Sequence, residues 1–202
     1  MTRLKICGIT RREDALACAE YGVDYLGFNF YTGSPRFIAV QEARSIIQDL
    51  PTTTKSVAIV VRPKRIDVLE MITESQVDMV QIHDPLDFSE FSEIPVPVIS
   101  AKRIGESISG TIELNGAEMI LLDTYTPEKF GGSGKAFNWS LVPDSIPRDR
   151  LVLAGGITPE NVQVALDQVK PAVIDVASGA EFSPGIKDLT KVKRLLDVIK
   201  NQ

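Results

Sequence analysis

The chain has 202 residues, 44% of them hydrophobic and 24% charged, and its formal net charge at pH 7 is −5. This length and balance predict one soluble globular domain over residues 1–202. The acidic balance argues against a nucleic-acid or membrane partner, and no apolar run approaches transmembrane length. Two cysteines, Cys7 and Cys18, indicate no disulfide framework and favour a cytoplasmic location. Lys5 and Arg11 interrupt the apolar N-terminal run, so we expect no signal peptide.

Short apolar runs rich in β-branched residues alternate along the chain with amphipathic stretches. The runs predict eight strands, at residues 4–7, 25–30, 56–61, 79–82, 96–103, 119–123, 151–154 and 173–176. The amphipathic stretches predict helices at residues 11–21, 41–49, 65–76, 85–93, 107–114, near Trp139, 159–168 and 188–200. Apolar strands joined by helices form parallel sheets covered on both faces. Eight such units predict an α/β fold, a single (β/α)8 TIM barrel with short loops.

Two local signals predict where helices begin. Thr10 followed by Glu13 has the spacing of a capping box, in which both side chains accept hydrogen bonds from backbone N–H groups. Thr158 followed by Pro159 combines an N-cap residue with a proline at the first helical position. We therefore expect the first helix to begin directly after the first strand and its turn.

Cys7 ends the first predicted strand, within the segment Lys-Ile-Cys-Gly-Ile-Thr at residues 5–10. Barrels of this kind keep their active sites at that end of the strands. The positive end of the following helix would favour the thiolate form of Cys7. The alternative is a buried cysteine that packs as a small hydrophobic side chain.

Asp123 ends the sixth predicted strand, directly after the apolar run at residues 119–122. It would share the barrel mouth with Cys7, on the opposite side, so a small substrate could lie between them. Partial burial raises the pKa of a carboxyl group, which makes Asp123 a candidate general acid. A solvated aspartate at the rim, or a cap, is the alternative.

Glycine-rich turns follow the last three predicted strands. They are Gly131-Gly132-Ser133-Gly134, Gly155-Gly156 and Ser178-Gly179. Backbone N–H groups in such turns can bind phosphate, and the loops after strands seven and eight form the usual phosphate site of this barrel. The alternative is that these glycines only allow positive φ in tight turns. Two successive pairs at neighbouring strand ends favour a phosphate site.

Six segments carry a family resemblance: KICGIT (5–10), GFNFYTGSPRFI (27–38), VQIH (80–83), LLDTYTPEKFGGSGKAFNW (122–139), LAGGITPENV (153–162) and IDVASGAEFSPGIKD (174–188). In this order and spacing they resemble the phosphoribosylanthranilate isomerase family of tryptophan biosynthesis. The resemblance implies a barrel without cofactor or metal, and a phosphosugar substrate. It implies the Amadori rearrangement of N-(5-phosphoribosyl)anthranilate to 1-(2-carboxyphenylamino)-1-deoxyribulose 5-phosphate, the third step of tryptophan synthesis from chorismate.

The resemblance also implies roles for individual residues. Asp123 would be the general acid that protonates the furanose ring oxygen and opens the ring to a Schiff base. Cys7 would be the general base that removes the C2 proton. Arg36 would bind the anthranilate carboxylate, for which a guanidinium is well suited because it can bind bidentately. The turns at Gly155-Gly156 and Ser178-Gly179 would bind the phosphate.

The sequence departs from the family pattern at four positions. Asn138 replaces a common aspartate, Ala177 a serine, Arg62 an asparagine or aspartate, and Asp84 a glycine. Arg62 and Asp84 would end neighbouring strands, either as an ion pair at the rim or as two independent solvated charges. None of the four is the proposed acid, base or arginine.

His83 is the only histidine, and we expect a hydrogen-bonding residue of the wall rather than a base. Three rival functions can be named. The related isomerase of histidine synthesis would need a second phosphate cradle, where residues 62–65 are basic but lack glycine. An aldolase would need a Schiff-base lysine, with Lys102 the candidate. A non-catalytic barrel would not need Cys7, Asp123 and Arg36 together. The oligomeric state, monomer or homodimer, does not follow from the sequence.

Overall fold

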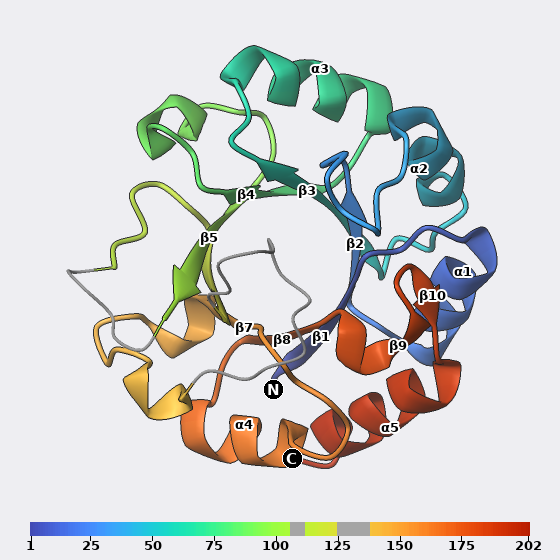
Figure 1. Cartoon of the computed structure of the whole chain (residues 1–202), viewed down its shortest axis with the longest axis vertical. Coiled ribbons are helices and arrows are strands. Elements are labelled where there is room, and N and C mark those ends of the chain that lie inside the picture. The colour runs from blue at the N-terminus through green and yellow to red at the C-terminus, as the bar shows by residue number, and fades with distance from the viewer. Residues whose placement is uncertain (106–111, 125–137) are drawn as a thin grey trace.

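The computed structural model describes residues 1–105, 112–124 and 138–202. Eight parallel strands close into a barrel in chain order, with β8 paired to β1 (Figure 1). They are β1 (Arg3–Cys7), β2 (Tyr25–Asn29), β3 (Lys55–Val61), β4 (Met79–His83), β5 (Val98–Ile104), β6 (Met119–Thr124), β7 (Leu151–Leu153) and β8 (Val173–Val176). The predicted barrel is confirmed, and each predicted strand end lies within two residues of the observed one.

Alternate residues of each strand face opposite sides of the barrel wall. Leu4 and Ile6 of β1 face outward and pack in the core between barrel and helices, so Lys5 and Cys7 face inward. An apolar layer that includes Leu121 of β6 fills the interior below the mouth. The barrel is therefore a packed core that leaves room for a site only at its ends.

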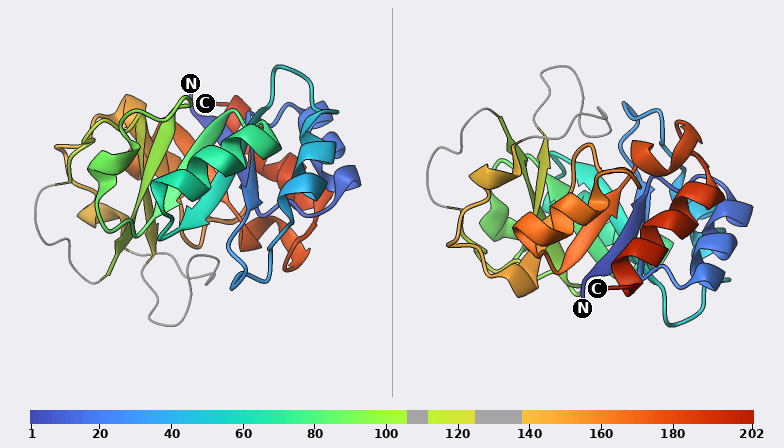
Figure 2. Two further views of the ribbon diagram at one scale, coloured as in Figure 1. Left: turned by 90° about the horizontal axis from the view of Figure 1, so that it is seen from above. Right: turned by 90° about the horizontal axis from the view of Figure 1, so that it is seen from below.

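Helices form a ring outside the barrel (Figure 1). The α-helices in the described residues are α1 (Arg12–Tyr21), α2 (Val40–Ile47), α3 (Arg65–Ser75), α4 (Val162–Val169) and α5 (Leu189–Lys200). The two chain termini lie side by side at one end of the barrel (Figure 2). None of the helices in these ranges is long and apolar enough to cross a membrane.

Three connections differ from the predicted helices. The helix expected at residues 85–93 is only the 3₁₀ turn η1 (Phe88–Phe91), whose N-cap Asp87 accepts a hydrogen bond from the Ser89 N–H. Pro85 precedes this segment and Pro95 follows it, which leaves little room for a longer helix. The short helix near Trp139 is the 3₁₀ turn η2 (Trp139–Leu141). Most of the helix expected at residues 107–114 lies outside the described residues, and residues 112–114 are not helical.

Both predictions of helix N-termini were wrong in detail. The helix α1 begins at Arg12 without a side-chain cap, because the Thr10 hydroxyl instead donates to the Gly185 carbonyl at 2.7 Å. Thr158 does accept a long bond of 3.3 Å from the Glu160 N–H, but α4 begins only at Val162.

A small hairpin after β8 was not predicted. It follows the 3₁₀ turn η4 (Ser178–Ala180) and consists of β9 (Glu181–Ser183) and β10 (Ile186–Lys187), which pair antiparallel. Strands this short carry no periodicity that a sequence pattern could reveal. The hairpin places Glu181 and Lys187 next to the C-terminal end of β1, where both are buried.

Candidate active site

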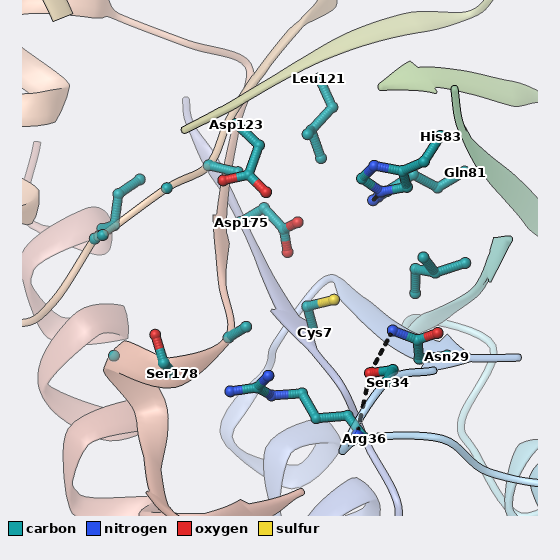
Figure 3. A pocket seen from close by; sticks show the side chains of 17 residues that line it. Cys7, Asn29, Ser34, Arg36, Gln81, His83, Leu121, Asp123, Asp175 and Ser178 are labelled. Carbon is teal, nitrogen blue, oxygen red and sulfur yellow. Dashed lines mark hydrogen bonds between the residues drawn. The ribbon is translucent and has the colours of Figure 1, made fainter. Parts of the chain in front are cut away.

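A pocket opens at the C-terminal ends of the barrel strands (Figure 3). About 620 Å³ of space lies between its walls, part of which is open to solvent. The predicted site residues all line it: Cys7, Arg36, Asp123, Gly155, Gly156, Ser178 and Gly179. The glycine turn at residues 131–134 lies outside the described residues. The remaining residues of the prediction are thus brought together from five separate parts of the chain.

Cys7 is half-buried at the end of β1, and its side chain points into the pocket (Figure 3). Burial raises the pKa of its thiol above the ordinary value, while the nearby charge of Lys5 acts in the opposite direction. The net shift favours the thiol, and the effect of a helix N-terminus on the thiolate stays a prediction. The turn at Gly8, with a φ of +78°, lies between Cys7 and α1, which begins only at Arg12.

Asp123 is buried near the end of β6 and also points into the pocket. Burial raises the pKa of its carboxyl group to about 6, although the Thr124 N–H, which donates to Oδ1 at 2.7 Å, lowers it. The predicted rise in pKa is confirmed. A carboxyl group that titrates near neutrality can donate a proton to a bound substrate.

Cys7 and Asp123 face the same space from different sides. Their strands, β1 and β6, are separated by β7 and β8 in the closed barrel. In Figure 3 the two side chains converge on the pocket, with the carboxylate of Asp175 between them. A carboxyl group and a thiol thus face one pocket from two directions.

Arg36 comes from the loop after β2 and lies against the hairpin that follows β8. Its Nε and Nη2 atoms donate to the carboxylate of Glu181 at 2.7–3.1 Å. Lys187 also donates to Glu181, at 2.6 Å, and to the carbonyl of Cys7, at 2.6 Å. A Cβ atom at Gly8 would lie 2.3 Å from Arg36 Cδ, so only glycine lets this arginine reach the pocket.

The glycine turns after β7 and β8 form one side of the pocket. Gly155 and Gly156 have φ of +87° and +64°. A Cβ atom at Gly155 would lie 2.2 Å from Thr124 Oγ1, and one at Gly179 would lie 1.9 Å from the Ile157 carbonyl oxygen. The backbone conformation and the close approach both require glycine, so these turns expose main chain rather than side chains to a ligand.

His83 lies in the wall of the pocket at the end of β4, as expected. Its Nε2 atom is 2.8 Å from the amide nitrogen of Gln81, which can only donate, so Nε2 accepts this bond. Burial lowers the pKa of His83 to about 4, and the Lys5 charge acts in the same direction. The imidazole is therefore neutral near pH 7.

Lys5 and Asp175 form an ion pair inside the barrel that sequence reasoning missed. The Lys5 ammonium lies 2.9 Å from both carboxylate oxygens of Asp175, and only 1% of Lys5 is exposed. The sequence does carry a signal, because each charge stands between two apolar residues of a buried strand. The neighbours of Lys5 face outward, as do Ile174 and Val176 around Asp175, so both charges face inward.

Of the two alternatives for Arg62 and Asp84, the structure shows the ion pair at the rim, at 3.3 Å. Asp84 also accepts a hydrogen bond from Arg103 at the end of β5, which the sequence did not suggest. Asn138 caps the turn η2 by accepting from the Ser140 N–H and hydroxyl. Lys102, the Schiff-base candidate, does not line the pocket, because its neighbour Ala101 is the residue that faces the interior.

No cluster that could hold a metal ion, of three or more His, Cys, Asp and Glu side chains, occurs in residues 1–105, 112–124 and 138–202.

The chain is similar along nearly its whole length to proteins of a known family. The family model of N-(5′-phosphoribosyl)anthranilate isomerase matches residues 4–198. The chain belongs to the N-(5′-phosphoribosyl)anthranilate isomerase family. A protein of that name from Pseudomonas fluorescens (strain Pf0-1) is 42% identical over 201 residues, which are 98% of each chain.

Solved structures of phosphoribosylanthranilate isomerases have the same fold. The Thermotoga maritima protein superposes with a TM-score of 0.86 at 37% identity, over all of both chains. The Thermus thermophilus protein superposes with a TM-score of 0.84 at 33% identity, over 99% of each chain. A further isomerase structure, with a TM-score of 0.83 at 36% identity over all of both chains, contains reduced 1-(o-carboxyphenylamino)-1-deoxyribulose 5-phosphate.

Proposed function

We propose that this chain rearranges N-(5-phosphoribosyl)anthranilate to 1-(2-carboxyphenylamino)-1-deoxyribulose 5-phosphate, with Asp123 as the acid and Cys7 as the base. The observation that carries the proposal is that these two side chains converge on one pocket. The glycine turns after β7 and β8 form one wall of that pocket. The reaction needs one acid and one base around a sugar, together with a phosphate anchor. Family membership supports the same activity.

Asp123 begins the reaction by protonating the furanose ring oxygen. Protonation breaks the C1–O bond and leaves an iminium between the sugar C1 and the anthranilate nitrogen. A pKa of about 6 suits this step, since the group holds a proton in part of the population at neutral pH and yields it readily. Once ionised, Asp123 faces the positive charge of the iminium across the pocket.

Cys7 completes the rearrangement by removing the C2 proton. The electrons of the C2–H bond form the C1–C2 double bond and neutralise the iminium nitrogen, which gives an enolamine. Tautomerisation of the enolamine to the ketone gives the product. Because a thiol of raised pKa is a stronger base once ionised, the raised pKa of Cys7 matches a carbon acid as its substrate.

The main-chain turns at Gly155-Gly156 and Ser178-Gly179 are proposed to bind the phosphate. Exposed peptide N–H groups and positive φ are features of anion-binding loops. A crystal grown with sulfate or phosphate is expected to hold the anion near Gly156, Ser178 and Gly179. An anion found only near Arg62 and Lys64, with these turns empty, would favour a substrate with two phosphates.

Arg36 is proposed to bind the carboxylate of the anthranilate ring. Its Nε and Nη2 atoms already bind Glu181, which fixes the guanidinium in place and leaves Nη1 outside that pair. We expect Arg36→Ala to raise KM by roughly 10–100-fold with a smaller change in kcat, since it removes a charge-assisted bond. Glu181 keeps Lys187 as a partner in this variant, which limits the effect on folding.

Two further variants make the Arg36 experiment decisive. Arg36→Lys keeps the charge but not the planar fork, so its KM is expected between wild type and Arg36→Ala. Arg12→Ala removes a surface arginine, paired with Asp49 at 2.9 Å, and is expected to leave KM unchanged. A wild-type KM in Arg36→Ala would show that the carboxylate is bound elsewhere.

The activity itself is tested with freshly prepared N-(5-phosphoribosyl)anthranilate and the purified chain. The fluorescence of the substrate is expected to decay in proportion to enzyme concentration, with the ketose identified as product by mass and by borohydride reduction. Decay at the rate of the enzyme-free solution would exclude the proposed reaction.

A further inference from the structure

The ion pair of Lys5 and Asp175 is buried inside the barrel, and neither residue takes part in the proposed proton transfers. The two residues are directly paired in the register of β1 and β8, and both point inward. The ammonium bonds both carboxylate oxygens at 2.9 Å. A buried pair of this kind rarely contributes much stability, because desolvation of both charges offsets their attraction. Its position therefore calls for another explanation.

Lys5 precedes Cys7 by two residues and shares its face of β1, so the two side chains are neighbours along the interior. An ammonium has three N–H donors, and the Asp175 carboxylate can take two of them. The ammonium also interacts favourably with ionised Cys7, both as a charge and as a hydrogen-bond donor. Burial raises the pKa of the Cys7 thiol, and of the surrounding charged groups Lys5 lowers it most.

The other cationic groups near Cys7 are bound to other partners. Lys187 and Arg36 also favour the thiolate, but both are bound to Glu181, and Lys187 bonds the carbonyl of Cys7 rather than its sulfur. Asp175 opposes the thiolate. Across the pocket, Asp123 is the proposed acid.

We propose that Lys5 is a positioning residue for the base: its ammonium, fixed by Asp175 on the inner face of β1, is the counter-charge that lets Cys7 become a thiolate inside the pocket. This inference rests on the proposed role of Cys7 as base. Asp175 has two effects in this arrangement, since it holds the ammonium in place and also limits how far the thiolate is favoured. Removing Lys5 must then raise the pKa of the Cys7 thiol, whereas removing Asp175 must lower it.

The test measures the thiol directly and needs no substrate. Alkylation of Cys7 by iodoacetamide is followed against pH, with the Cys7 peptide quantified by mass spectrometry, so that reaction at Cys18 does not interfere. At a pH below the thiol pKa, Lys5→Met is expected to react at least ~10-fold more slowly than wild type, which corresponds to a pKa higher by about one unit. Lys55→Met, which removes an exposed lysine paired with Asp78, is expected to react like wild type.

Lys5→Met leaves the Asp175 carboxylate buried without a counter-charge and could fail to fold for that reason. Two variants at Asp175 keep the experiment decisive in that case. Asp175→Asn is expected to react faster than wild type, since it removes the opposing charge while the asparagine side-chain oxygen can still accept a hydrogen bond from Lys5. Lys5→Met/Asp175→Asn lacks both charges and is expected to react more slowly than wild type. Equal alkylation profiles in wild type and the folded variants would overturn the role of Lys5.

Turnover separates this inference from the function on which it rests. If Cys7→Ala is inactive while the alkylation profiles are all alike, Cys7 remains the base and the role of Lys5 fails. If Cys7→Ala turns over normally, the assignment of the base fails and the inference with it.

Discussion

Replacing Cys7 by alanine is expected to lower kcat by at least ~10²-fold, the usual scale for the loss of a positioned base. The variant keeps a small side chain at the end of β1, and the bond from Lys187 to the Cys7 carbonyl is unaffected because it involves main chain. Folding and the binding of phosphate ligands are therefore expected to stay close to wild type. Steady-state kinetics on the fresh substrate, together with anion binding followed by calorimetry, check both expectations.

The other cysteine provides the matched control. Cys18 is fully buried in α1, and burial raises the pKa of its thiol to about 12. It faces the outer core rather than the pocket, so Cys18→Ala is expected to keep the wild-type kcat, at some cost in stability. A Cys7→Ala enzyme with a kcat close to that of Cys18→Ala would mean that another group takes the C2 proton.

Asp123→Asn is expected to lower kcat by ~10²–10⁴-fold with a smaller change in KM. Asparagine keeps the shape of the side chain, and its carbonyl oxygen can still accept the bond from the Thr124 N–H, but it has no carboxylic proton to donate. Asp144→Asn changes an exposed aspartate, paired with Arg148, and serves as the control with unchanged kinetics. Full activity in Asp123→Asn would place the acid elsewhere.

The pH dependence of kcat/KM adds a separate check on Asp123. The active form has Asp123 protonated and Cys7 ionised, so kcat/KM of the wild type rises with pH up to about 6 and is then level until Cys7 ionises. Above the pKa of Cys7, kcat/KM falls, because Cys7 is already ionised while Asp123 continues to lose its proton. In Asp123→Asn only Cys7 titrates, and the residual kcat/KM should keep rising above pH 6. A variant that keeps the break near pH 6 would contradict the assignment.

The barrel was predictable because its signals are local. Apolar runs such as residues 119–122 and 173–176 are buried on both faces of a parallel sheet, and eight of them in regular alternation with helices leave few other folds. The residues at the strand ends then follow from topology, which is why Cys7 and Asp123 could be placed at one mouth from sequence alone.

Features that depend on distant partners were not predictable. Thr10 has the spacing of a capping residue, but a carbonyl 175 residues away in the hairpin turn takes its hydroxyl. The same hairpin brings Glu181 to Arg36, and no pattern in either segment points to the other. The burial that raises the thiol pKa of Cys7 also depends on the finished barrel, and the segment around Cys7 alone does not reveal it.

The central claim is that Cys7 and Asp123 act on one substrate in one pocket. The most direct test is turnover of fresh N-(5-phosphoribosyl)anthranilate by wild type, the two single variants and Cys7→Ala/Asp123→Asn at matched concentrations. Groups that serve one reaction are expected to be non-additive, so the double variant should be about as slow as the slower single variant, and wild type faster than all three by at least ~10²-fold. A double variant that still turned over at the wild-type rate would contradict the claim.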